Sequence, residues 1–452
     1  MAKPSDIDRR EFLRAASAAG VSLAMTNRFP SPAILSHRSP NERVRVAVMG
    51  LNSRGMVHAQ NFARLANTEV AYLCDVDSKV LAKAQAAMQT QAGSRPGSTK
   101  VPKAVGDFRR ALDDKEVDAL AIAAPDHWHT PAAILAMQAG KHVYVEKPCG
   151  HDPHEGELLV RAQQKYRRVV QMGNQQRSAP RSIEAIQAIR GGAIGRAYLA
   201  RAWYANTRGT IGHGKPAPVP ANLDYELWQG PAPRTTYRDN VIHYNWHWFR
   251  RWGTGEICNN GTHEIDIARW ALGVDYLTRV SSAGGRYHFA DDWEFSDTQE
   301  VVFEFDGGRT IVWHGQSCNG LQTFGRGRGT VVLGTTGSLL LDRDGYVLFD
   351  AKGKIVKEVR EAATTDGLNL VGDDAATASH MQNFADAVRT GEALRSPIAE
   401  GAKSVLLCHL GNIAQFTGRQ LRTDPASGRI LGDAEAMKYW RREYARGWEP
   451  RV

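Results

Sequence analysis

Residues 44–145 alternate between short apolar runs and longer stretches with helical spacing, and this alternation limits most strongly what the chain can fold into. The apolar runs are residues 44–50, 69–75, 118–124 and 142–145. Strands that alternate with helices form a parallel sheet, because each helix returns the chain to the same end of the sheet. We therefore predict an α/β fold that begins with a parallel sheet over residues 43–168.

The fourth apolar run ends abruptly in V-Y-V-E-K-P-C, residues 143–149. An apolar run followed by Glu146, Lys147 and Pro148 describes a buried parallel strand whose carboxyl end opens onto a crevice, where open α/β sheets bind their ligands. Lys147 is therefore our first candidate catalytic residue. The alternative is a solvated lysine in an ordinary turn.

The first apolar run leads into a turn and a helix that suit a dinucleotide. Gly50 and Gly55 occupy the first and third glycine positions of a G-x-G-x-x-G motif, whereas Asn52 replaces the second. After a strand and before a helix, such a turn presents backbone N–H groups to a pyrophosphate. Asparagine tolerates left-handed backbone angles but brings a side chain toward the phosphates. We assign Gly50, Asn52, Ser53, Arg54 and Gly55 to cofactor binding.

The second apolar run ends in Asp75, 25 positions after Gly50. An acid at this place accepts hydrogen bonds from the adenosine ribose hydroxyls. Val76 and Asp77 follow, with no arginine to receive a 2′-phosphate, so NAD is favoured over NADP. The alternative for Asp75 is a helix N-cap, which Asp77 or Ser78 could serve equally well. These residues predict a Rossmann domain that binds NAD.

The sequence P-D-H-W-H at residues 125–129 separates the third apolar run from its helix. A His-x-His pair could suggest a metal, but no third ligand lies nearby in the sequence, and we predict no metal site. We place Pro125, His127 and His129 at the nicotinamide pocket instead.

These motifs, above all Glu146-Lys147-Pro148, resemble those of the Gfo/Idh/MocA oxidoreductases over nearly everything after Glu42. The resemblance implies that the proline is cis and that Lys147 points at a substrate hydroxyl beside the nicotinamide. It also implies that a turn at residues 173–177 faces cofactor and substrate. We therefore assign Glu146, Lys147 and Gln175 to the cofactor and Arg177 to the substrate; the alternative for the turn is a solvated loop.

The stretch 253–266 resembles the D-x-G-x-H signature of the same family. His263 matches the histidine that removes the hydroxyl proton, a task that suits a side chain with a pKa near neutral. Asn259 stands where the family has aspartate; an amide can orient a histidine or hold a substrate hydroxyl but cannot offset an imidazolium charge. Asp266, one helical turn further, either supplies that charge or packs its helix. Lys147, Asn259 and His263 are our catalytic candidates, and Asn259 and His263 also contact substrate.

Aromatic residues gather after a long segment, 206–243, that is rich in glycine, proline and arginine and reads as a functional loop or an insertion. Trp246, Trp248 and Trp252 resemble a carbohydrate platform, since flat aromatic faces pack against a pyranose. The alternative is packing in a hydrophobic core.

Residues 169–435 are predicted to form a substrate and oligomerisation domain. Alternating apolar patterns and Asp-Gly, Gly-Gly and Lys-Gly turns predict a large antiparallel sheet. Its strands are predicted at residues 298–305, 310–315, 330–333, 338–341, 346–350 and 354–359. We expect amphipathic helices near 380–389 and 400–416 to cover the other side of this sheet, and residues 436–452 to form a packed tail. The resemblance implies a homodimer or homotetramer through the sheet.

Residues 1–40 resemble a twin-arginine export signal and linker, with Arg9 and Arg10 before a weakly apolar stretch at 15–25. Eleven residues are too few to span a membrane, and the alternative is a short amphipathic helix. We expect the twin-arginine translocase to export the folded protein to the periplasm or beyond, with its cofactor already loaded.

The remaining composition excludes several classes of protein. The chain has 452 residues, 42% of them hydrophobic, which is ordinary for two globular domains. Residues 1–45 hold eight basic and four acidic side chains, so four of the nine net positive charges lie there; we expect no nucleic acid partner. Five scattered cysteines imply neither disulfides nor zinc.

Three hypotheses follow. The first is an exported oxidoreductase that moves hydride between a tightly bound NAD and a secondary hydroxyl or ketone of a sugar, polyol or glycoside. The second resembles glycoside hydrolase family 109, which uses bound NAD to oxidise a sugar transiently, eliminate the aglycone and reduce the product. The third, motivated by Asn52 and Asn259, is a sugar-binding relative with reduced catalysis.

Overall fold

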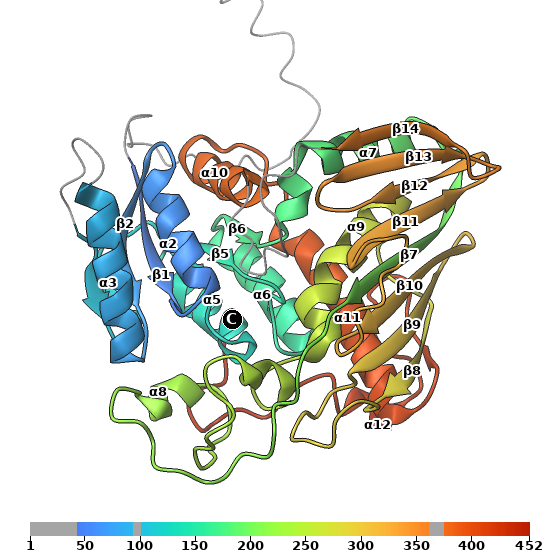
Figure 1. Cartoon of the computed structure of the whole chain (residues 1–452). Helices are drawn as coiled ribbons and strands as arrows, with labels where there is room; N and C mark the ends of the chain where they lie inside the picture. Colours follow the sequence, from blue (N-terminus) through green and yellow to red (C-terminus); the bar gives the residue numbers. More distant parts are fainter. Residues whose placement is uncertain (1–42, 94–100, 361–374) are drawn as a thin grey trace, which may run out of the picture. The chain divides into compact units, whose positions relative to one another are not determined.

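The computed structural model describes residues 43–93, 101–360 and 375–452 (Figure 1). The predicted export signal at residues 1–40 lies outside these ranges. Within them, no helix combines the length and the apolar character that crossing a membrane requires.

The first domain is built on a six-stranded parallel sheet with the order β3-β2-β1-β4-β5-β6. Its strands are β1 (Val44–Met49), β2 (Thr68–Cys74), β3 (Lys103–Val105), β4 (Ala119–Ile122), β5 (His142–Val145) and β6 (Val170–Met172). The order reverses between β1 and β4, which is the topological switch point at which such sheets bind ligands. The predicted Rossmann-type fold is confirmed.

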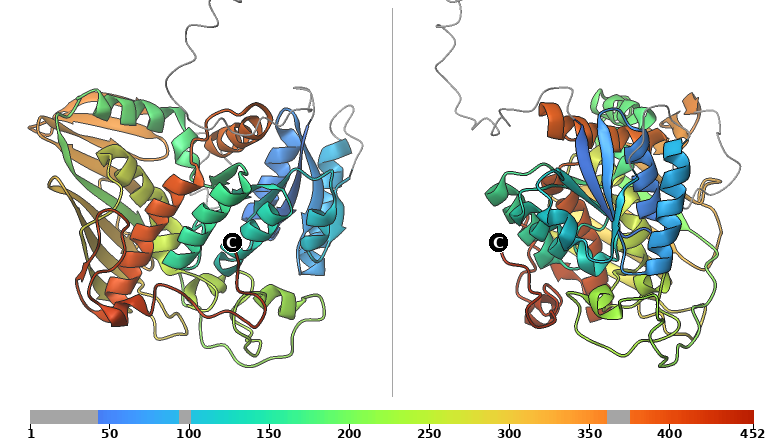
Figure 2. Two further views of the ribbon diagram at one scale, coloured as in Figure 1. Left: turned by 180° about the vertical axis from the view of Figure 1, so that it is seen from behind. Right: turned by 90° about the vertical axis from the view of Figure 1, so that its left-hand side faces the viewer.

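Helices cover both faces of this sheet, as buried parallel strands require. One face packs against α2 (Arg54–Arg64), α3 (Ser78–Gly93) and α10 (Ala375–Thr390). The other packs against α4 (Arg109–Asp113), α5 (His129–Gln138) and α6 (Pro153–Tyr166). Figure 2 shows both layers from two further sides.

Two segments that the sequence assigned to the second domain belong to the first. Strand β6 pairs in parallel with β5, with Val170 opposite Val143, so the sheet continues past the predicted boundary at residue 168. Helix α10 was expected on the antiparallel sheet, but it buries Met381 and Phe384 against β1 and α2. An amphipathic pattern predicts a buried face without specifying which sheet covers it.

The second domain contains a nine-stranded sheet with the order β14-β13-β12-β11-β7-β10-β9-β8-β15. Its strands are β7 (Ala197–Ala205), β8 (Arg279–Gly285), β9 (Thr298–Phe305), β10 (Arg309–Gln316), β11 (Arg328–Gly334), β12 (Gly337–Leu341), β13 (Gly345–Asp350), β14 (Ile355–Arg360) and β15 (Leu421–Arg422). All neighbours pair antiparallel except β7 and β10, which are parallel. All six predicted strands are present. The central strand β7 was missed because its four alanines weaken the strand pattern.

Helices cover one face of the nine-stranded sheet (Figures 1 and 2). They are α7 (Pro180–Arg190), α9 (Thr262–Leu272), α11 (Ile398–Thr417) and the short α12 (Ala434–Met437). Helix α11 also packs on α6 of the first domain, so the two domains share a continuous apolar contact. The expectation for the helix near residues 400–416 is confirmed.

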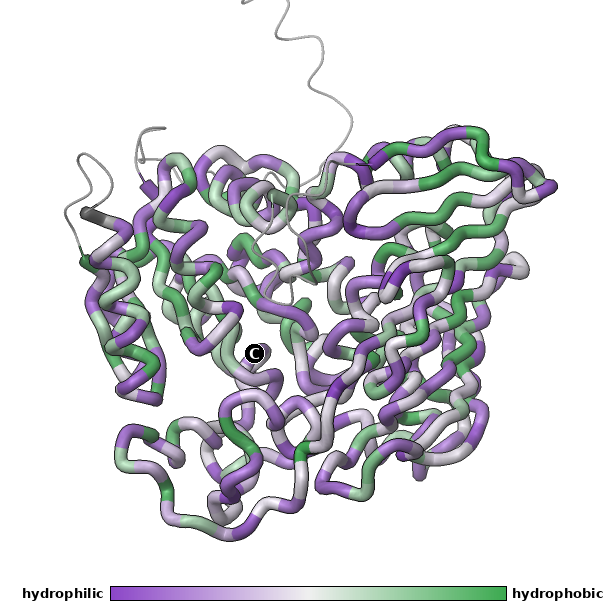
Figure 3. The backbone as a smooth tube through the Cα atoms, viewed as in Figure 1, coloured by the Kyte–Doolittle hydropathy of each residue, from purple (hydrophilic) through white to green (hydrophobic). Residues whose placement is uncertain are grey.

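The segment of residues 206–248 forms a small lobe with its own apolar core. It contains α8 (Tyr225–Gln229) and the short 3-10 helix η3 (Asn245–Trp248). The core combines the side chains of Leu223, Tyr225, Trp228, Ala232, Tyr237 and Val241 with those of Phe249 and Trp252, which follow the segment directly. Figure 3 shows this lobe as mostly hydrophilic, with a few apolar residues along it. We call residues 206–248 the loop lobe.

Candidate active site

The carboxyl ends of the parallel strands open into a cavity of about 1300 Å³ between the two domains and the loop lobe. Thirteen of the predicted site residues line it: Gly50, Asn52, Ser53, Arg54, Asp75, Pro125, His129, Glu146, Lys147, Gln175, Trp246, Asn259 and His263. Residues far apart in the sequence therefore meet at one place, at the switch point where a ligand is expected.

The turn after β1 has the shape that a dinucleotide needs. Gly50 has a φ of 81°, and a Cβ there would lie 2.7 Å from the carbonyl oxygen of Ala123. A Cβ at Gly55 would lie 1.5 Å from the carbonyl oxygen of Gly50. Both positions therefore require glycine. Asn52 is exposed and lines the cavity, so it leaves the turn itself undistorted, and α2 begins directly behind the turn with its N–H groups available to phosphates.

Asp75 holds this turn at the end of β2. Its carboxylate accepts hydrogen bonds from the backbone N–H groups of Leu51, at 2.7 Å, and Asp77, at 2.9 Å. Burial raises the pKa of Asp75. The N-cap of α3 is provided by Asp77, which accepts from the N–H of Lys79 at 2.8 Å. Asp75 is therefore not needed as an N-cap, and its position at the end of β2 suits hydrogen bonds with the ribose hydroxyls of a dinucleotide.

Glu146 joins the cofactor turn to the end of β5. Its Oε1 accepts from Arg54 Nε at 2.7 Å and Gln175 Nε2 at 3.1 Å, and contacts His58 Nε2 at 2.9 Å. Burial opposes the charged carboxylate, but Arg54 and His58 hold the pKa of Glu146 well below its usual value. Gly173 leaves the necessary room, because a Cβ there would lie 2.8 Å from Glu146 Oε2.

Lys147 reaches from the first domain to the second. The peptide bond between Lys147 and Pro148 is cis, as the resemblance implied. Lys147 Nζ donates to Asn259 Oδ1 at 2.8 Å. Burial lowers the pKa of Lys147, while the carboxylates of Glu146 and Asp126 act in the opposite direction. The ammonium lies where a substrate hydroxyl at the cavity wall could contact it.

His263 lies in the first turn of α9, behind the π-helical turn η4 (Ile257–Gly261). Such π turns recur at functional sites because they re-aim the side chains around them. Burial lowers the pKa of His263 well below its usual value, and the positive charges of Lys147, Arg343 and Arg328 add to this effect. The lowered pKa favours the uncharged imidazole, which has a ring nitrogen free to accept a proton but is a weaker base than the near-neutral histidine that the sequence suggested.

His127 is placed outside the cavity, contrary to our assignment. Its Nε2 contacts the backbone oxygen of Trp228 at 2.9 Å in the protein interior. His129 lines the cavity, but its two ring nitrogens contact the backbone oxygens of Pro148 and Ala124. His127 belongs to the 3-10 turn η1 (Asp126–Trp128), and His129 is the first residue of α5. Among the described residues, no group of three or more His, Cys, Asp or Glu side chains is placed to hold a metal.

Arg177, assigned to the substrate, is instead buried against Asp266. Its Nε and Nη2 donate to the two carboxylate oxygens at 2.7 and 2.8 Å. Ser404 also donates to Asp266, at 2.6 Å. Arg177 belongs to the 3-10 turn η2 (Gln175–Ser178) and Asp266 to α9, so the bidentate ion pair joins these two elements. Asp266 therefore packs its helix, and its charge is balanced by Arg177 rather than available to His263.

The three tryptophans divide between cavity and core. Trp246 lines the cavity, with His247 stacked on its ring at 3.6 Å. Trp248 is 1% exposed and stacks on Trp293 at 3.9 Å. Trp252 is buried in the core of the loop lobe. The platform assignment thus fails for Trp248 and Trp252, because side chains inside a core offer no face to a sugar.

Sequence reasoning missed several residues of the site. Asp126 lines the cavity with its carboxylate buried, which raises its pKa, and it accepts a hydrogen bond from Thr254. Arg208 and Tyr244 come from the loop lobe and share a hydrogen bond of 2.8 Å at the cavity wall. Glu256 lies behind this wall and accepts from Arg208 Nε at 2.8 Å. Its position three residues before Asn259, about one helical turn, was the available signal.

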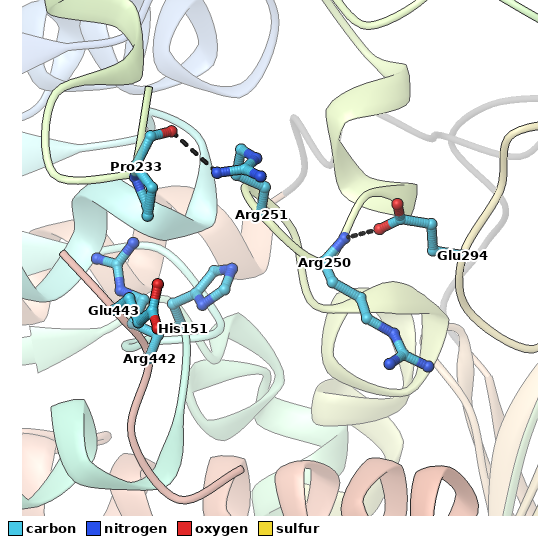
Figure 4. A pocket seen from close by; sticks show the side chains of 7 residues that line it. All are labelled: His151, Pro233, Arg250, Arg251, Glu294, Arg442 and Glu443. Carbon is cyan, nitrogen blue, oxygen red and sulfur yellow. Dashed lines mark hydrogen bonds between the residues drawn. The ribbon is translucent and has the colours of Figure 1, made fainter. Parts of the chain in front are cut away.

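A smaller cavity of about 690 Å³ lies apart from these residues (Figure 4). It is lined by His151, Pro233, Arg250, Arg251, Glu294, Arg442 and Glu443. Its arginines are already engaged: Arg251 donates to the oxygen of Pro233, and Arg442 donates to Glu155. The candidate catalytic residues all belong to the larger cavity.

Comparison with known proteins agrees with both domains. Residues 44–174 match the oxidoreductase family with an NAD-binding Rossmann fold, and residues 201–449 match the C-terminal alpha/beta domain of the same family. The chain belongs to the Gfo/Idh/MocA oxidoreductase family.

Among Gfo/Idh/MocA relatives, glycosyl hydrolase family 109 protein 2 of Shewanella sp. (strain ANA-3) is 32% identical over 157 residues, which cover 32% of this chain and 34% of that protein. A family 109 protein of Saccharopolyspora erythraea is 31% identical over 179 residues, 37% of this chain and 39% of that protein. The chain thus matches about a third of the length of these curated relatives.

Solved structures share the fold over most of this chain. Levoglucosan dehydrogenase, in complex with NADH and levoglucosan, is similar with a TM-score of 0.65 and 19% identity, over 84% of this chain and 99% of that one. Aldose-aldose oxidoreductase from Caulobacter crescentus, complexed with glycerol, gives a TM-score of 0.62 at 19% identity, over 84% of this chain and 100% of that one.

The pairing of Arg177 with Asp266 predicts a structural role that stability measurements detect. Arg177→Ala leaves a buried carboxylate without its partner, so we expect a loss of about 3–5 kcal/mol in the free energy of unfolding. Urea denaturation measures it. The double variant Arg177→Met, Asp266→Leu should recover much of the loss, since it removes both charges.

Arg181→Ala is the control, because Arg181 pairs with Glu184 at the surface, where an ion pair contributes less than about 1 kcal/mol. A stable Arg177→Ala protein whose only defect is a raised KM would return Arg177 to the substrate site.

Proposed function

We propose that the protein is an exported, NAD-dependent oxidoreductase that acts on a secondary hydroxyl or ketone of a sugar, polyol or glycoside. The observation that carries this proposal is that the dinucleotide turn with Asp75 and the trio Lys147, Asn259 and His263 line one cavity. Members of the same fold bind NADH and levoglucosan, or glycerol, which supports a polyhydroxylated substrate.

The residues fit NAD and divide the chemistry among themselves. Gly50, Arg54 and Asp75 would hold the cofactor, and when bound it supplies the hydride acceptor or donor. Lys147 donates a hydrogen bond to the substrate oxygen and stabilises its negative charge. His263, neutral at pH 7, takes the hydroxyl proton, and Asn259 fixes the ammonium by accepting from Nζ. Asp75, with no arginine beside it, supports NAD over NADP.

The loop lobe supports tight retention of the cofactor. Asn222 Nδ2 donates to Asp77 Oδ1 at 2.8 Å, and His243 Nε2 contacts Asp77 Oδ2 at 2.9 Å. The backbone adds two bonds, from Ser78 N–H to Asn222 and from Asp224 N–H to Val76. These contacts attach the lobe at Asp77, two residues after Asp75, at the end of the cavity where the adenosine would bind. A cofactor enclosed there would leave only after these contacts open.

The first test is the cofactor itself. We expect purified protein, once denatured, to release a nicotinamide dinucleotide that mass spectrometry identifies as NAD. Adding the right sugar to the native protein should then raise the absorbance at 340 nm by at most one equivalent, because the cofactor stays bound. Lys147→Met should abolish this change while retaining the dinucleotide. Protein that contains no dinucleotide and fails to bind added NAD would refute the proposal.

Opening the loop lobe should speed the loss of cofactor. His243→Ala removes one of two side-chain contacts to Asp77, and we expect the NAD dissociation rate to rise about tenfold, the equivalent of about 1.4 kcal/mol. Dialysis followed by mass spectrometry measures the retained fraction. His213→Ala is the control, because His213 belongs to the same lobe but is exposed and contacts Asp292, outside the lobe, instead of Asp77. Equal loss of NAD from both variants would argue that the contacts between the loop lobe and Asp77 do not retain the cofactor.

The alternative is a redox-elimination glycosidase. The resemblance to family 109 proteins at 31–32% identity favours it. It would release nitrophenol from a nitrophenyl glycoside without net formation of NADH. Oxidation of free sugars with no glycoside cleavage would favour the simple oxidoreductase, and binding without either reaction would favour a binding protein.

We also propose twin-arginine export and self-association. Arg9 and Arg10 support export, which cell fractionation would test with an Arg9→Lys, Arg10→Lys variant as the control. One register row across the outer face of the nine-stranded sheet supports a dimer or tetramer. It runs through Ser281, Val302, Val312, Arg201, Val331, Leu340 and Val347. Val302 and Val312 are apolar and partly exposed, whereas Val331, Leu340 and Val347 are already buried in a cluster with Trp203. Sedimentation as a monomer would contradict the assembly.

A further inference from the structure

The Lys147 ammonium has a neutral partner where a charged one is expected. Its direct acceptor is the amide oxygen of Asn259, 2.8 Å away. Glu146, its neighbour in sequence, is bound to Arg54 and His58. A partly buried ammonium needs negative charge nearby, and the carboxylates of Glu146, Asp126 and Glu256 all act on Lys147. The Asn259 amide needs, in addition, a group that fixes its orientation.

Glu256 is the group that orients Asn259, because its carboxylate contacts the NH₂ end of the amide. Asn259 Nδ2 lies 3.5 Å from Glu256 Oε1, while the other end of the same amide accepts from Lys147. Asn260 Nδ2 donates to Oε1 at 2.5 Å, and Ser317 Oγ donates to Oε2 at 3.1 Å. Glu256 is 5% exposed. Its orientation is fixed on several sides, so the amide between it and Lys147 has one favourable direction.

The amide dipole reinforces the arrangement. Its carbonyl oxygen faces the ammonium and its N–H group faces the carboxylate, which is the direction in which both ends are stabilised. A flipped Asn259 would place the NH₂ group against the ammonium. The carboxylate thereby selects the orientation that holds Lys147.

We propose that Glu256 is a positioning residue of the reacting centre: it holds the Asn259 amide in the orientation that faces Lys147, and it adds its negative charge to those of Glu146 and Asp126 in keeping Lys147 an ammonium directed at the substrate oxygen. The charge stands one helical turn before the position at which the related D-x-G-x-H signature carries its aspartate. The protein has thus moved the carboxylate rather than lost it. This inference rests on the proposed function for its role in catalysis.

Several charged groups act on Lys147, and together they determine how far a substitution of Glu256 can change its protonation. The carboxylates of Glu146, Asp126 and Glu256 favour the ammonium, and Arg54 opposes it. The histidines His263 and His247 also interact with its charge.

Glu256 itself faces Arg208, whose pair with it lowers the pKa of Glu256 although burial opposes the charged form. Removing the carboxylate therefore also leaves Arg208 less well balanced, and this second effect needs a control.

The experiment measures the protonation of Lys147 without relying on turnover. Purified protein saturated with NAD is treated with acetic anhydride over a range of pH, and mass spectrometry follows acetylation of the peptide that contains Lys147. Only the free amine reacts, so the rate reports the deprotonated fraction. The variants are Glu256→Gln, Asn259→Asp and the double variant Glu256→Gln, Asn259→Asp.

We expect Lys147 in Glu256→Gln to be acetylated about tenfold faster at a fixed pH below the midpoint, because the ammonium has lost one of its balancing charges and the group that orients Asn259. The double variant should return the rate to within about threefold of wild type, since the charge is back next to Lys147. An unchanged rate in Glu256→Gln, or a double variant that is as fast as the single one, would overturn the proposal.

Glu264→Gln is the matched control. Glu264 is also a buried carboxylate of this region and pairs with Arg328, a cavity arginine, at 2.6 Å, but no contact links it to Lys147. It should leave acetylation of Lys147 unchanged; an effect equal to that of Glu256→Gln would indicate general disturbance and refute a specific role.

The outcomes separate this inference from the proposed function. If Glu256→Gln changes the acetylation rate of Lys147 but the protein neither oxidises nor cleaves a sugar, the proposed role of Glu256 is supported and the proposed reaction is refuted. If sugar is oxidised but neither acetylation nor the pH profile of kcat changes in Glu256→Gln, the reaction stands and Glu256 has only a structural role.

Discussion

The hydrogen bond from Lys147 to Asn259 is the contact on which the site depends. It joins the end of a strand in one domain to a helical turn in the other, so neither domain alone forms the reacting centre. The relative position of the domains is fixed elsewhere, by the apolar packing of α11 on α6 and by the insertion of α10 beside β1. Packing of apolar surface thus provides the rigidity that the polar contact needs.

A second set of contacts, ion pairs, neutralises other buried carboxylates near this centre. Glu146 is committed to Arg54 and His58, and Asp266 to Arg177. Each of these buried carboxylates has its own cation, as Glu256 has in Arg208, and the ammonium of Lys147 makes its direct hydrogen bond to the neutral amide of Asn259. Since buried charges require close partners, the distribution of ion pairs decides which side chains remain available to a substrate.

Much of the first domain follows from sequence, because short-range patterns determine it. The apolar runs, Gly50 and Gly55, and the E-K-P turn each have a local physical meaning, and the structure places Lys147, Asn259 and His263 in one cavity. The errors concern long-range packing. Arg177 and Trp248 look like ligand-binding residues in the sequence, but their partners Asp266 and Trp293 lie 89 and 45 positions away. No local pattern reveals such pairs.

The central claim is that Lys147 and His263 act on one hydroxyl of a sugar in the large cavity. A crystal structure of the protein with NAD and a bound sugar tests it most directly. We predict a single sugar hydroxyl within about 3.2 Å of both Lys147 Nζ and a ring nitrogen of His263, the reach that proton transfer needs. A sugar held elsewhere in the molecule, with neither side chain near any of its hydroxyls, would contradict the account.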